Sequence, residues 1–456
     1  MRASDVIELV EDRLDPAVKT ERQRCTDVDV LLAADPEQPW IDTGRPEGDR
    51  EKIKANLRRL AGTPLLRLIV EETAQHMVAD GVASDSGRDT SAMWAAFERN
   101  AFPSRQGSLY AAALSYGSAY MLALPGHSQT VEGTAAALTM FSPKQFHVVY
   151  GDAADDEWPM YALRTISQGD TTAYRLIDEE AEHYLARNEE GRLEYIEARP
   201  HRLGVCPVVR YAPNADIDGV SQGEPDRFKV VAQRHTKSTH DRLMAQHYNS
   251  WKVRYATGLA EPGSPEEEQR TTAVLSNQDM LTGGPGVSFG TLAETSLDGL
   301  LRAEDADLHT LAAVAQKPVW SLSGGQLVNL SADAIAEARS TERLKIQSFQ
   351  RTVGRSHTQA LRLASFIEGR DEDAADFGLH ITWQDTEARS LSQAADALGK
   401  IASQLAVPPA LLWDMIPGVS PTKAREWQSY ADAHPTVDET LAAHLSVQEP
   451  GYGQDS

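Results

Sequence analysis

Two long stretches of this chain lack the residues that interrupt helices. Residues 226–257 contain neither glycine nor proline, and residues 332–368 contain only Gly354. At 1.5 Å per residue, these stretches predict single helices roughly 45–50 Å and roughly 55 Å long. Residues 258–299 lie between them and are rich in glycine and proline. The chain is therefore expected to contain two long helices with a compact excursion between them, which is an uncommon arrangement.

The first long stretch changes character along its length. Its first half is polar on nearly all sides, with the charged or titratable residues Arg234, His235, Lys237, His240 and Asp241. Its second half carries an apolar stripe at helical spacing, formed by Met244, Tyr248, Trp251 and Tyr255. Such a helix cannot lie in a core along its whole length. We expect it to contact other subunits or to line a wet space.

The excursion admits two interpretations. Its glycines, prolines and acidic run at 266–268 are typical of a disordered linker. Residues 287–292 are strand-like, which favours a small β-rich insertion instead. A shorter helix is then predicted at 301–316, and Pro318 ends it. The apolar face of that helix consists of Leu308, Leu311 and Ala315.

The first 211 residues predict an α+β domain. Thr63 and Pro64 have the pattern of an N-cap and a first helical residue, and further helices are expected at 91–100 and 106–117. The helix after Pro64 should turn apolar side chains toward a core, namely Leu65, Leu68, Ile69 and Met77. Strand-like runs occur at 119–124, 146–150, 161–166, 172–177, 193–196 and 205–211. Turn residues between the runs favour antiparallel meanders over a parallel sheet.

The second long stretch and the residues after it predict further helices. Ser331 is a candidate N-cap for the long helix, whose apolar stripe consists of Ile346, Phe349, Val353, Ala360, Leu363 and Ile367. A strand at 379–383 precedes an amphipathic helix marked by Leu391, Ala395, Leu398, Ala402 and Leu405. Pro409 and Pro421 each stand where a first helical residue would, and Thr436 and Glu439 have the spacing of a capping box. We expect residues 449–456 to form a disordered tail.

The composition is that of an acidic globular protein. Of the 456 residues, 41% are hydrophobic and 24% are charged, which is ordinary for globular chains. The formal charge of −23 argues against a protein that coats nucleic acid, although an acidic surface could let DNA slide past without holding it. Cys25 and Cys206 have no metal or redox spacing and are interpreted as buried thiols of a reducing, cytoplasmic compartment. We expect neither a signal peptide nor a membrane span, since no apolar run approaches about 18 residues.

Residues 322–326 spell Leu-Ser-Gly-Gly-Gln, the sequence by which ATP-binding cassettes grip a nucleotide across their dimer. A cassette also needs a phosphate-binding loop of the form G-x-x-x-x-G-K-[ST], and the sequence contains none. No apolar run ending in Asp-Glu follows either. The five residues are better interpreted as a flexible connector between the helix that Pro318 ends and the one that Ser331 begins.

Other candidate chemistry is equally incomplete. His235, His240 and His247 have no cysteine or carboxylate at the offsets of a metal site. Ser118 lacks the second glycine of a nucleophile elbow and is interpreted as a helix-to-strand turn. The acidic run at 155–157 is interpreted as a solvated loop. The sequence therefore predicts no catalytic residue, no cofactor and no metal.

Several phrases, taken in their order along the chain, resemble the portal proteins of long-tailed bacteriophages, the siphophage-type head-to-tail connectors. Residues 116–121 (YGSAYM), 141–143 (FSP) and 203–209 (LGVCPVV) resemble the wing domain of that family. Residues 329–331 (NLS), Trp383 and residues 388–397 (ARSLSQAADA) resemble its C-terminal half. The resemblance covers about residues 56–435.

The resemblance implies an α+β fold of portal type in which every stretch has a place. The implied parts are an α+β wing (1–223), a first stem helix (224–257), a small β-containing clip (258–300), a second stem helix (301–316), a tunnel loop (317–330), a long wing helix with a wing strand (331–390), a small helical crown (391–448) and a disordered tail (449–456).

Members of this family form rings, commonly of twelve subunits, around the DNA channel at one capsid vertex. The resemblance therefore implies a non-enzymatic conduit for genome packaging and ejection, located in the virion after assembly in the host cytoplasm. The implied partners are double-stranded DNA passing without sequence specificity, the terminase large subunit, the major capsid or scaffold protein and a head-completion (adaptor) protein. No cofactor and no membrane are implied.

Two sets of site residues follow from that assignment. In the tunnel loop, the residues expected to face DNA are Lys317, Trp320, Ser323, Gly324, Gly325, Gln326 and Asn329. In the clip, those expected to face the motor or the connector are Glu266, Glu267, Glu268 and Arg270. Lys317 is the only charged residue of the loop, which predicts a neutral tip near DNA.

Two other functions remain open from the residues alone. One is an ATP-binding cassette-like protein that uses residues 322–326. The other is a helical adaptor or scaffold that forms no ring and whose long helices are coiled coils.

Overall fold

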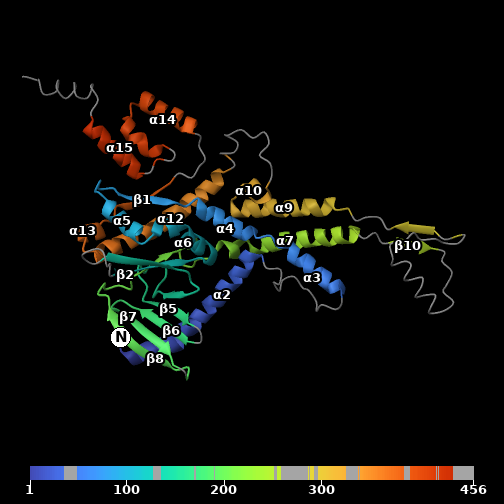
Figure 1. Ribbon diagram of the computed structural model, residues 1–456, viewed down its shortest axis with the longest axis horizontal. Helices are drawn as coiled ribbons and strands as arrows, with labels where there is room; N and C mark the ends of the chain where they lie inside the picture. The colour runs from blue at the N-terminus through green and yellow to red at the C-terminus, as the bar shows by residue number, and fades with distance from the viewer. Residues whose placement is uncertain are drawn as a thin grey trace, which may run out of the picture.

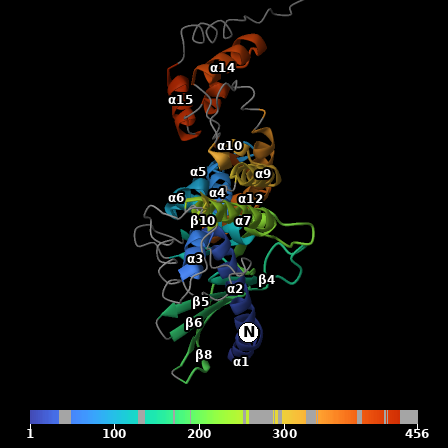
Figure 2. The same cartoon turned by 90° about the vertical axis from the view of Figure 1, so that its right-hand side faces the viewer.

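The computed structural model has a mixed body of helices and sheets from which two helices project as an arm (Figure 1). A separate group of short C-terminal helices lies on another side of the body, as both views show (Figures 1 and 2). The backbone is described for residues 1–34, 49–126, 135–168, 171–188, 190–250, 254–257, 286, 288–291, 296–324, 337, 339–384, 391–416, 419 and 421–434.

The N-terminal helices cover one face of a five-stranded antiparallel sheet. Helix α1 (Ala3–Glu8), a π-helical turn (Leu9–Leu14) and α2 (Asp15–Ala33) follow one another without a break. The sheet has the order β4 (Phe146–Val149), β5 (Tyr161–Gln168), β6 (Thr171–Ile177), β7 (Ala181–Arg187) and β8 (Leu193–Pro200). Val6, Val10, Leu14 and Val18, four residues apart, pack on Leu163, Leu176 and Leu185 of the sheet. This spacing places the four side chains on one helix face.

The main core lies around a second, three-stranded sheet of order β3 (Ala135–Phe141), β2 (Ala119–Gly126) and β9 (Val208–Tyr211). Helices α4 (Leu65–Gln75), α5 (Ser91–Arg99) and α6 (Phe102–Tyr116) contribute to the same core. Gly117 ends α6 with φ +83°, and a Cβ there would lie 2.5 Å from the Ser221 carbonyl oxygen. Only glycine suits this tight junction between α6 and β2.

Helix α12 (Ser340–Ile367) runs through the body and contacts α5, the three-stranded sheet and β12. Phe349, Val353, Ala360, Leu363 and Ile367 on its inner face are buried in the main core. After α13 (Asp371–Ala374), strand β12 (Leu379–Trp383) pairs antiparallel with β1 (Ala79–Ser84), nearly 300 residues earlier in the chain. The N- and C-terminal halves therefore share one core.

The arm consists of α7 (Glu224–Ser250) and α9 (Asp298–Ala315), which lie side by side (Figure 1). At its far end, β10 (Arg254–Thr257) pairs antiparallel with β11 (Ser288–Thr291). Near the body, α3 (Asp49–Ala61) packs on α7, and the short α10 (Val319–Ser323) follows α9.

The C-terminal group contains α14 (Leu391–Leu405), a 3₁₀ helix (Pro409–Met415) and α15 (Pro421–Ala433). Trp413 and Trp427 meet edge to face, with ring centroids 6.1 Å apart. Both prolines begin their helices, as the sequence predicts. Thr436, Glu439 and the tail lie outside the described residues.

Most of the predicted elements are confirmed, including the α+β class and the antiparallel meander. Helices at 91–99 and 301–315, the strand at 379–383, the turn at Ser118 and the two buried thiols also agree with the sequence predictions. The exposed chain at 155–157 fits the predicted solvated loop. Four of the described strands were not predicted, namely β1, β3, β7 and β10.

Two predictions about helices were wrong. The first long helix ends at Ser250, and residues 254–257 form β10 instead, because they pair with a strand more than 30 residues away. Leu68 is 40% exposed, since the buried face of α4 is formed by the pairs at 65–66, 69–70 and 73–74. The described part of α12 begins at Ser340, and the predicted N-cap Ser331 lies outside the described residues.

Candidate channel-forming arm and its attachment to the body

The two arm helices are joined by several polar side chains. Asp307 on α9 accepts hydrogen bonds from Arg234 Nε (2.5 Å) and Ser238 Oγ (2.7 Å) of α7. One turn further out, Glu304 accepts from Arg242 Nε (2.5 Å) and Thr239 Oγ1 (2.9 Å). Each carboxylate thus binds one guanidinium and one hydroxyl of the facing helix, which fixes the register of the two helices.

His235 lies between these two contacts on the inner side of α7. Its Nε2 is 3.9 Å from Glu304, and its Nδ1 is buried without a hydrogen-bond partner among the described residues. Burial lowers the pKa of His235 even though Glu304 and Asp307 act in the opposite direction. The imidazole is therefore neutral at neutral pH and adds no charge to the interior of the arm.

The tip of the arm is a short antiparallel pair of strands. Arg254 is opposite Thr291, and Thr257 is opposite Ser288. Of the two interpretations of the excursion, the β-rich one holds for these strands. The predicted partner-facing residues Glu266, Glu267, Glu268 and Arg270 lie outside the described residues.

The predicted DNA-facing loop begins at the inner end of the arm. Gln316, with φ +57°, ends α9, and Pro318 precedes α10. Trp320 is half-buried, Ser323 is exposed, and Gly324 ends α10 with φ +61°. Gly325, Gln326 and Asn329 lie outside the described residues. Of the neutral residues predicted to face DNA, only Trp320, Ser323 and Gly324 are therefore among the described residues.

Lys317 does not occupy the position that the sequence predicted for it. It is 5% exposed, and its Nζ lies 2.6 Å from Glu342 Oε1 and 3.3 Å from Glu72 Oε2. An ammonium held by two carboxylates inside the body cannot meet a phosphate outside it. Lys317 is thus a buried structural cation, and it is removed from the DNA-facing set.

A second buried lysine lies beside it. Lys345 Nζ pairs with Glu224 and donates to the Ala315 carbonyl oxygen at 3.1 Å. The rings of Phe228 and Phe349 lie 5.2 and 5.6 Å from the ammonium. Burial lowers the pKa of Lys345, while Glu224 raises it in part.

Sequence reasoning missed these buried charges, although one signal was present. The apolar stripe of α12, extended four and seven residues before Phe349, reaches Lys345 and Glu342. Charged residues at core-facing positions of a helix indicate buried ion pairs, because an unpaired charge there would be very costly.

Glu72, His76 and Glu342 place their ligand atoms within 4.8 Å of one another, which would suit a metal ion. The Lys317 ammonium already bridges the two carboxylates, however. The lysine takes the place of a metal, so the arrangement is an ion pair cluster.

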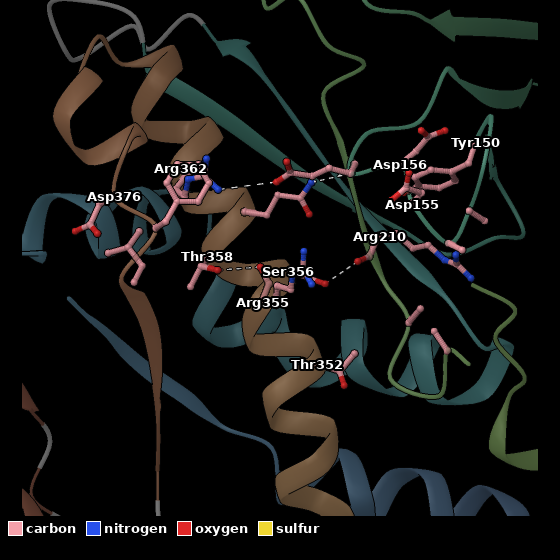
Figure 3. A pocket seen from close by; sticks show the side chains of 18 residues that line it. Tyr150, Asp155, Asp156, Arg210, Thr352, Arg355, Ser356, Thr358, Arg362 and Asp376 are labelled. Carbon is pink, nitrogen blue, oxygen red and sulfur yellow. Dashed lines mark hydrogen bonds and ion pairs between the residues drawn. The ribbon is translucent and has the colours of Figure 1, made fainter. Parts of the chain in front are cut away.

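A cavity of about 450 Å³ lies between α12 and the loop at 150–157 (Figure 3). Arg355 and Arg362 of α12 line one side of it, and Asp155 and Asp156 line the other. Arg362 Nη1 lies 3.9 Å from Glu157 Oε1 of the same loop. Two of its hydroxyls bind backbone carbonyls: Ser356 donates to Arg210 at 2.7 Å and Thr358 to Arg355 at 2.9 Å. Within the described residues, the cavity offers no hydroxyl paired with a general base, and we assign it no catalysis.

None of the described helices is both long enough and apolar enough to cross a bilayer. Every strand pair in the described part of the chain is antiparallel, unlike the parallel sheet of a nucleotide-binding cassette.

A body with a meander sheet, a polar two-helix arm ending in a strand pair and a group of C-terminal helices make up an α+β subunit of portal type. Residues 12–434 match the family model described as phage portal protein, SPP1 Gp6-like, and the chain belongs to this family.

Solved structures similar to the chain come from gene transfer agent particles. A chain from the virion of the native particle is 16% identical, with a TM-score of 0.43, covering 84% of this chain and 99% of that one. A chain from the neck of the empty particle, computed with C6 symmetry, is 17% identical, with a TM-score of 0.46, covering 82% and 95%. One from the neck of the native particle, computed with C12 symmetry, is 14% identical, with a TM-score of 0.43, covering 84% and 98%. No curated protein matches the sequence.

Proposed function

We propose that the protein is a portal subunit that forms a ring at one capsid vertex, through which the viral genome is packaged and ejected. The observation that carries the proposal is the polar arm of α7 and α9, which projects from the body and ends in a strand pair (Figure 1). In a ring, neighbouring arms would together surround a water-filled channel. The role is structural and needs neither a cofactor nor a catalytic residue.

We assign the parts of the subunit to the portal parts that the resemblance implies. The wing would comprise residues 1–223 and 331–390, the crown residues 391–448, and the arm would be the stem, with the clip at its tip. Two boundaries change from the sequence prediction. The first stem helix would end at Ser250, so β10 would belong with the clip, and the second stem helix would begin at Asp298.

The charge of the chain supports free passage of DNA. Each subunit carries −23, and a ring of twelve would carry 12 × −23, or −276. Phosphates would be repelled by acidic channel walls, whereas basic walls would bind them by releasing counterions. The neutral residues of the loop that starts at α10 would be nearest to DNA, namely Trp320, Ser323, Gly324, Gly325, Gln326 and Asn329.

The tip of the arm would dock other proteins of the particle. The proposed partners there are the terminase large subunit during packaging and a head-completion (adaptor) protein afterwards, with Glu266, Glu267, Glu268 and Arg270 as contact residues. The wing would contact the major capsid or scaffold protein. The ring would assemble in the host cytoplasm and remain in the virion.

Imaging the purified protein tests the proposal. Twelve copies of the 49.9 kDa chain would form a particle of roughly 600 kDa with a central hole, visible by electron microscopy and weighed by mass photometry. A protein that remains monomeric across protein concentrations and salt conditions contradicts it. Extended particles without a hole would instead favour the helical adaptor.

A further inference from the structure

The two buried lysines meet where the arm joins the body. The Glu224 carboxylate that binds Lys345 is in the first turn of α7, and the Ala315 carbonyl that binds the same ammonium is the last residue of α9. One side chain of α12 therefore holds the inner ends of both arm helices.

Lys317 provides a second contact between the end of the arm and the body. It follows α9 directly, and its ammonium binds Glu342 of α12 and Glu72 of α4. Glu342 and Lys345 are three residues apart, on one face of α12. Glu342 therefore binds Lys317, the second residue after α9, and Lys345, in the same turn of α12, binds Glu224 at the start of α7.

The junction is buried and electrically balanced. The side chains of Glu224, Glu342 and Lys317 are 1%, 4% and 1% exposed, and that of Lys345 is 7% exposed. With Glu72 and the more exposed Arg227, which lies 3.4 Å from Glu224, three acidic and three basic groups face one another. Asn214 donates a further hydrogen bond to Glu224, at 3.0 Å.

The buried charges at the junction of arm and body are better explained by the helix arrangement that they impose than by a gain in stability. A buried ion pair is often no more stable than an apolar pair of the same size, because both ions lose their hydration. A buried ion pair nevertheless disfavours every arrangement of the helices in which one charge would lose its partner, because an unpaired buried charge is strongly destabilising. An apolar junction would tolerate small shifts between α7, α9 and α12, whereas this one is stable in a single register.

We propose that Glu72, Glu224, Glu342, Lys317 and Lys345 form an arm clamp, a set of positioning residues that fixes the direction of the arm relative to the body. A consequence for ring geometry, which rests on the proposed function, follows from this clamp. In a closed ring, the angle between arm and body is repeated at every subunit, so a fixed angle limits how many subunits close the ring.

The clamp is tested with variants that remove a pair without leaving a buried charge alone. Lys317→Met would strand the Glu342 carboxylate and is expected to fold poorly. In Lys317→Met/Glu342→Gln both charges of the closest pair are gone. Glu72 loses its 3.3 Å contact with the ammonium, and its Oε2 is buried, but its side chain is 18% exposed and keeps partial access to water. The matched control is Arg175→Met/Glu182→Gln, a largely buried pair in the five-stranded sheet with side chains 17% and 12% exposed.

Hydrogen–deuterium exchange of the purified full-length protein gives the readout. In the Lys317→Met/Glu342→Gln protein, amides of residues 312–323 and 342–349 should exchange at least about tenfold faster, with the five-stranded sheet unchanged. The control should show the reverse pattern. Unchanged exchange at these amides, or equal acceleration along the whole chain, overturns the clamp.

Ring imaging of the same variant extends the test. The Lys317→Met/Glu342→Gln protein should give rings with a wider spread of subunit numbers than the unmodified chain, and an equal spread overturns the link to ring geometry. If the unmodified chain forms no ring, the portal proposal fails, while the exchange experiment still decides the clamp.

Discussion

The Nε2 atom of His357 lies 2.8 Å from the Tyr110 hydroxyl, at the centre of the main core. Tyr110 donates its own hydrogen to Gln106 Oε1 at 3.2 Å, so its oxygen accepts the hydrogen on Nε2. Because burial keeps the ring neutral, Nδ1 is bare and accepts from the Tyr211 hydroxyl at 3.0 Å, a stronger acceptor for that hydrogen than Met121 Sδ at 3.7 Å. Both nitrogens of the fully buried imidazole are therefore hydrogen-bonded in its neutral form, the form that burial favours. Helix α12 is thereby joined to α6 and β9.

This neutral histidine makes the stability of the protein depend on pH. Burial lowers the pKa of His357 from 6.5 to about 3. Between about pH 6.5 and pH 3, His357 is protonated in the unfolded chain but neutral in the folded protein. The free energy of unfolding therefore decreases as the pH falls below about 6.5. Relative to a His357→Gln variant, the unmodified protein should lose up to about 1.4 kcal/mol per pH unit in this window.

Denaturant unfolding at pH 7, 6, 5 and 4 measures the difference between the two proteins. The matched control is His309→Gln, which changes an exposed histidine of α9 and should keep the slope of the unmodified chain. If the His357→Gln protein loses stability with the same slope as the unmodified chain, His357 is protonated in the folded state and the hydrogen-bond assignment is wrong.

Gly354 gives a prediction about stability in the middle of α12. Its backbone is helical, and a Cβ there would lie 3.9 Å from atoms of Ile381 and Trp383, at ordinary contact distance. Because glycine costs about 1 kcal/mol relative to alanine inside a helix, Gly354→Ala should stabilise the protein by up to that amount. The control Gly117→Ala, at φ +83°, should destabilise it. Thermal unfolding followed by circular dichroism measures both, and a lower midpoint for Gly354→Ala contradicts the prediction.

Local patterns were enough to predict much of the architecture. The stripe through Phe349, Val353 and Ala360 is buried as its helical spacing predicts, since a helix core is defined by residues three and four apart. Prolines at 409 and 421 mark helix starts for an equally local reason. The resemblance to portal proteins rested on the order of such local phrases, and the family match confirms it.

What could not be predicted depends on residues far apart in sequence. Tyr255 continues a helical pattern, yet it is in β10, because its partner Gly290 comes from the other side of the excursion. Lys317 looks like a solvated loop residue until Glu72 and Glu342 are brought to it from α4 and α12. In both cases a tertiary contact overrides the local preference, and a single sequence does not show which distant residues make that contact.

The segment after α10 gives the prediction that most directly concerns DNA. Its start is fixed inside the body, because Lys317 is bound to Glu342 and Leu322 is buried, while Ser323 and Gly324 are exposed. Deleting Gly324 and Gly325 shortens the segment without touching these anchors. Rings should therefore assemble normally, whereas DNA packaging should be impaired.

Particles carrying this deletion are compared with particles in which Ser-Ser replaces the two glycines, which keeps the length of the segment. Ring formation is scored by electron microscopy, and packaging by the nuclease-resistant DNA per particle. The Ser-Ser protein should package more DNA than the deletion protein if reach toward DNA is what matters. Loss of rings on deletion would mean that the segment is a structural connector, and normal packaging would mean that it does not lie near DNA. Either result would remove Trp320, Ser323 and Gly324 from the proposed DNA-facing set, and the channel would then have to be explained by the arm helices alone.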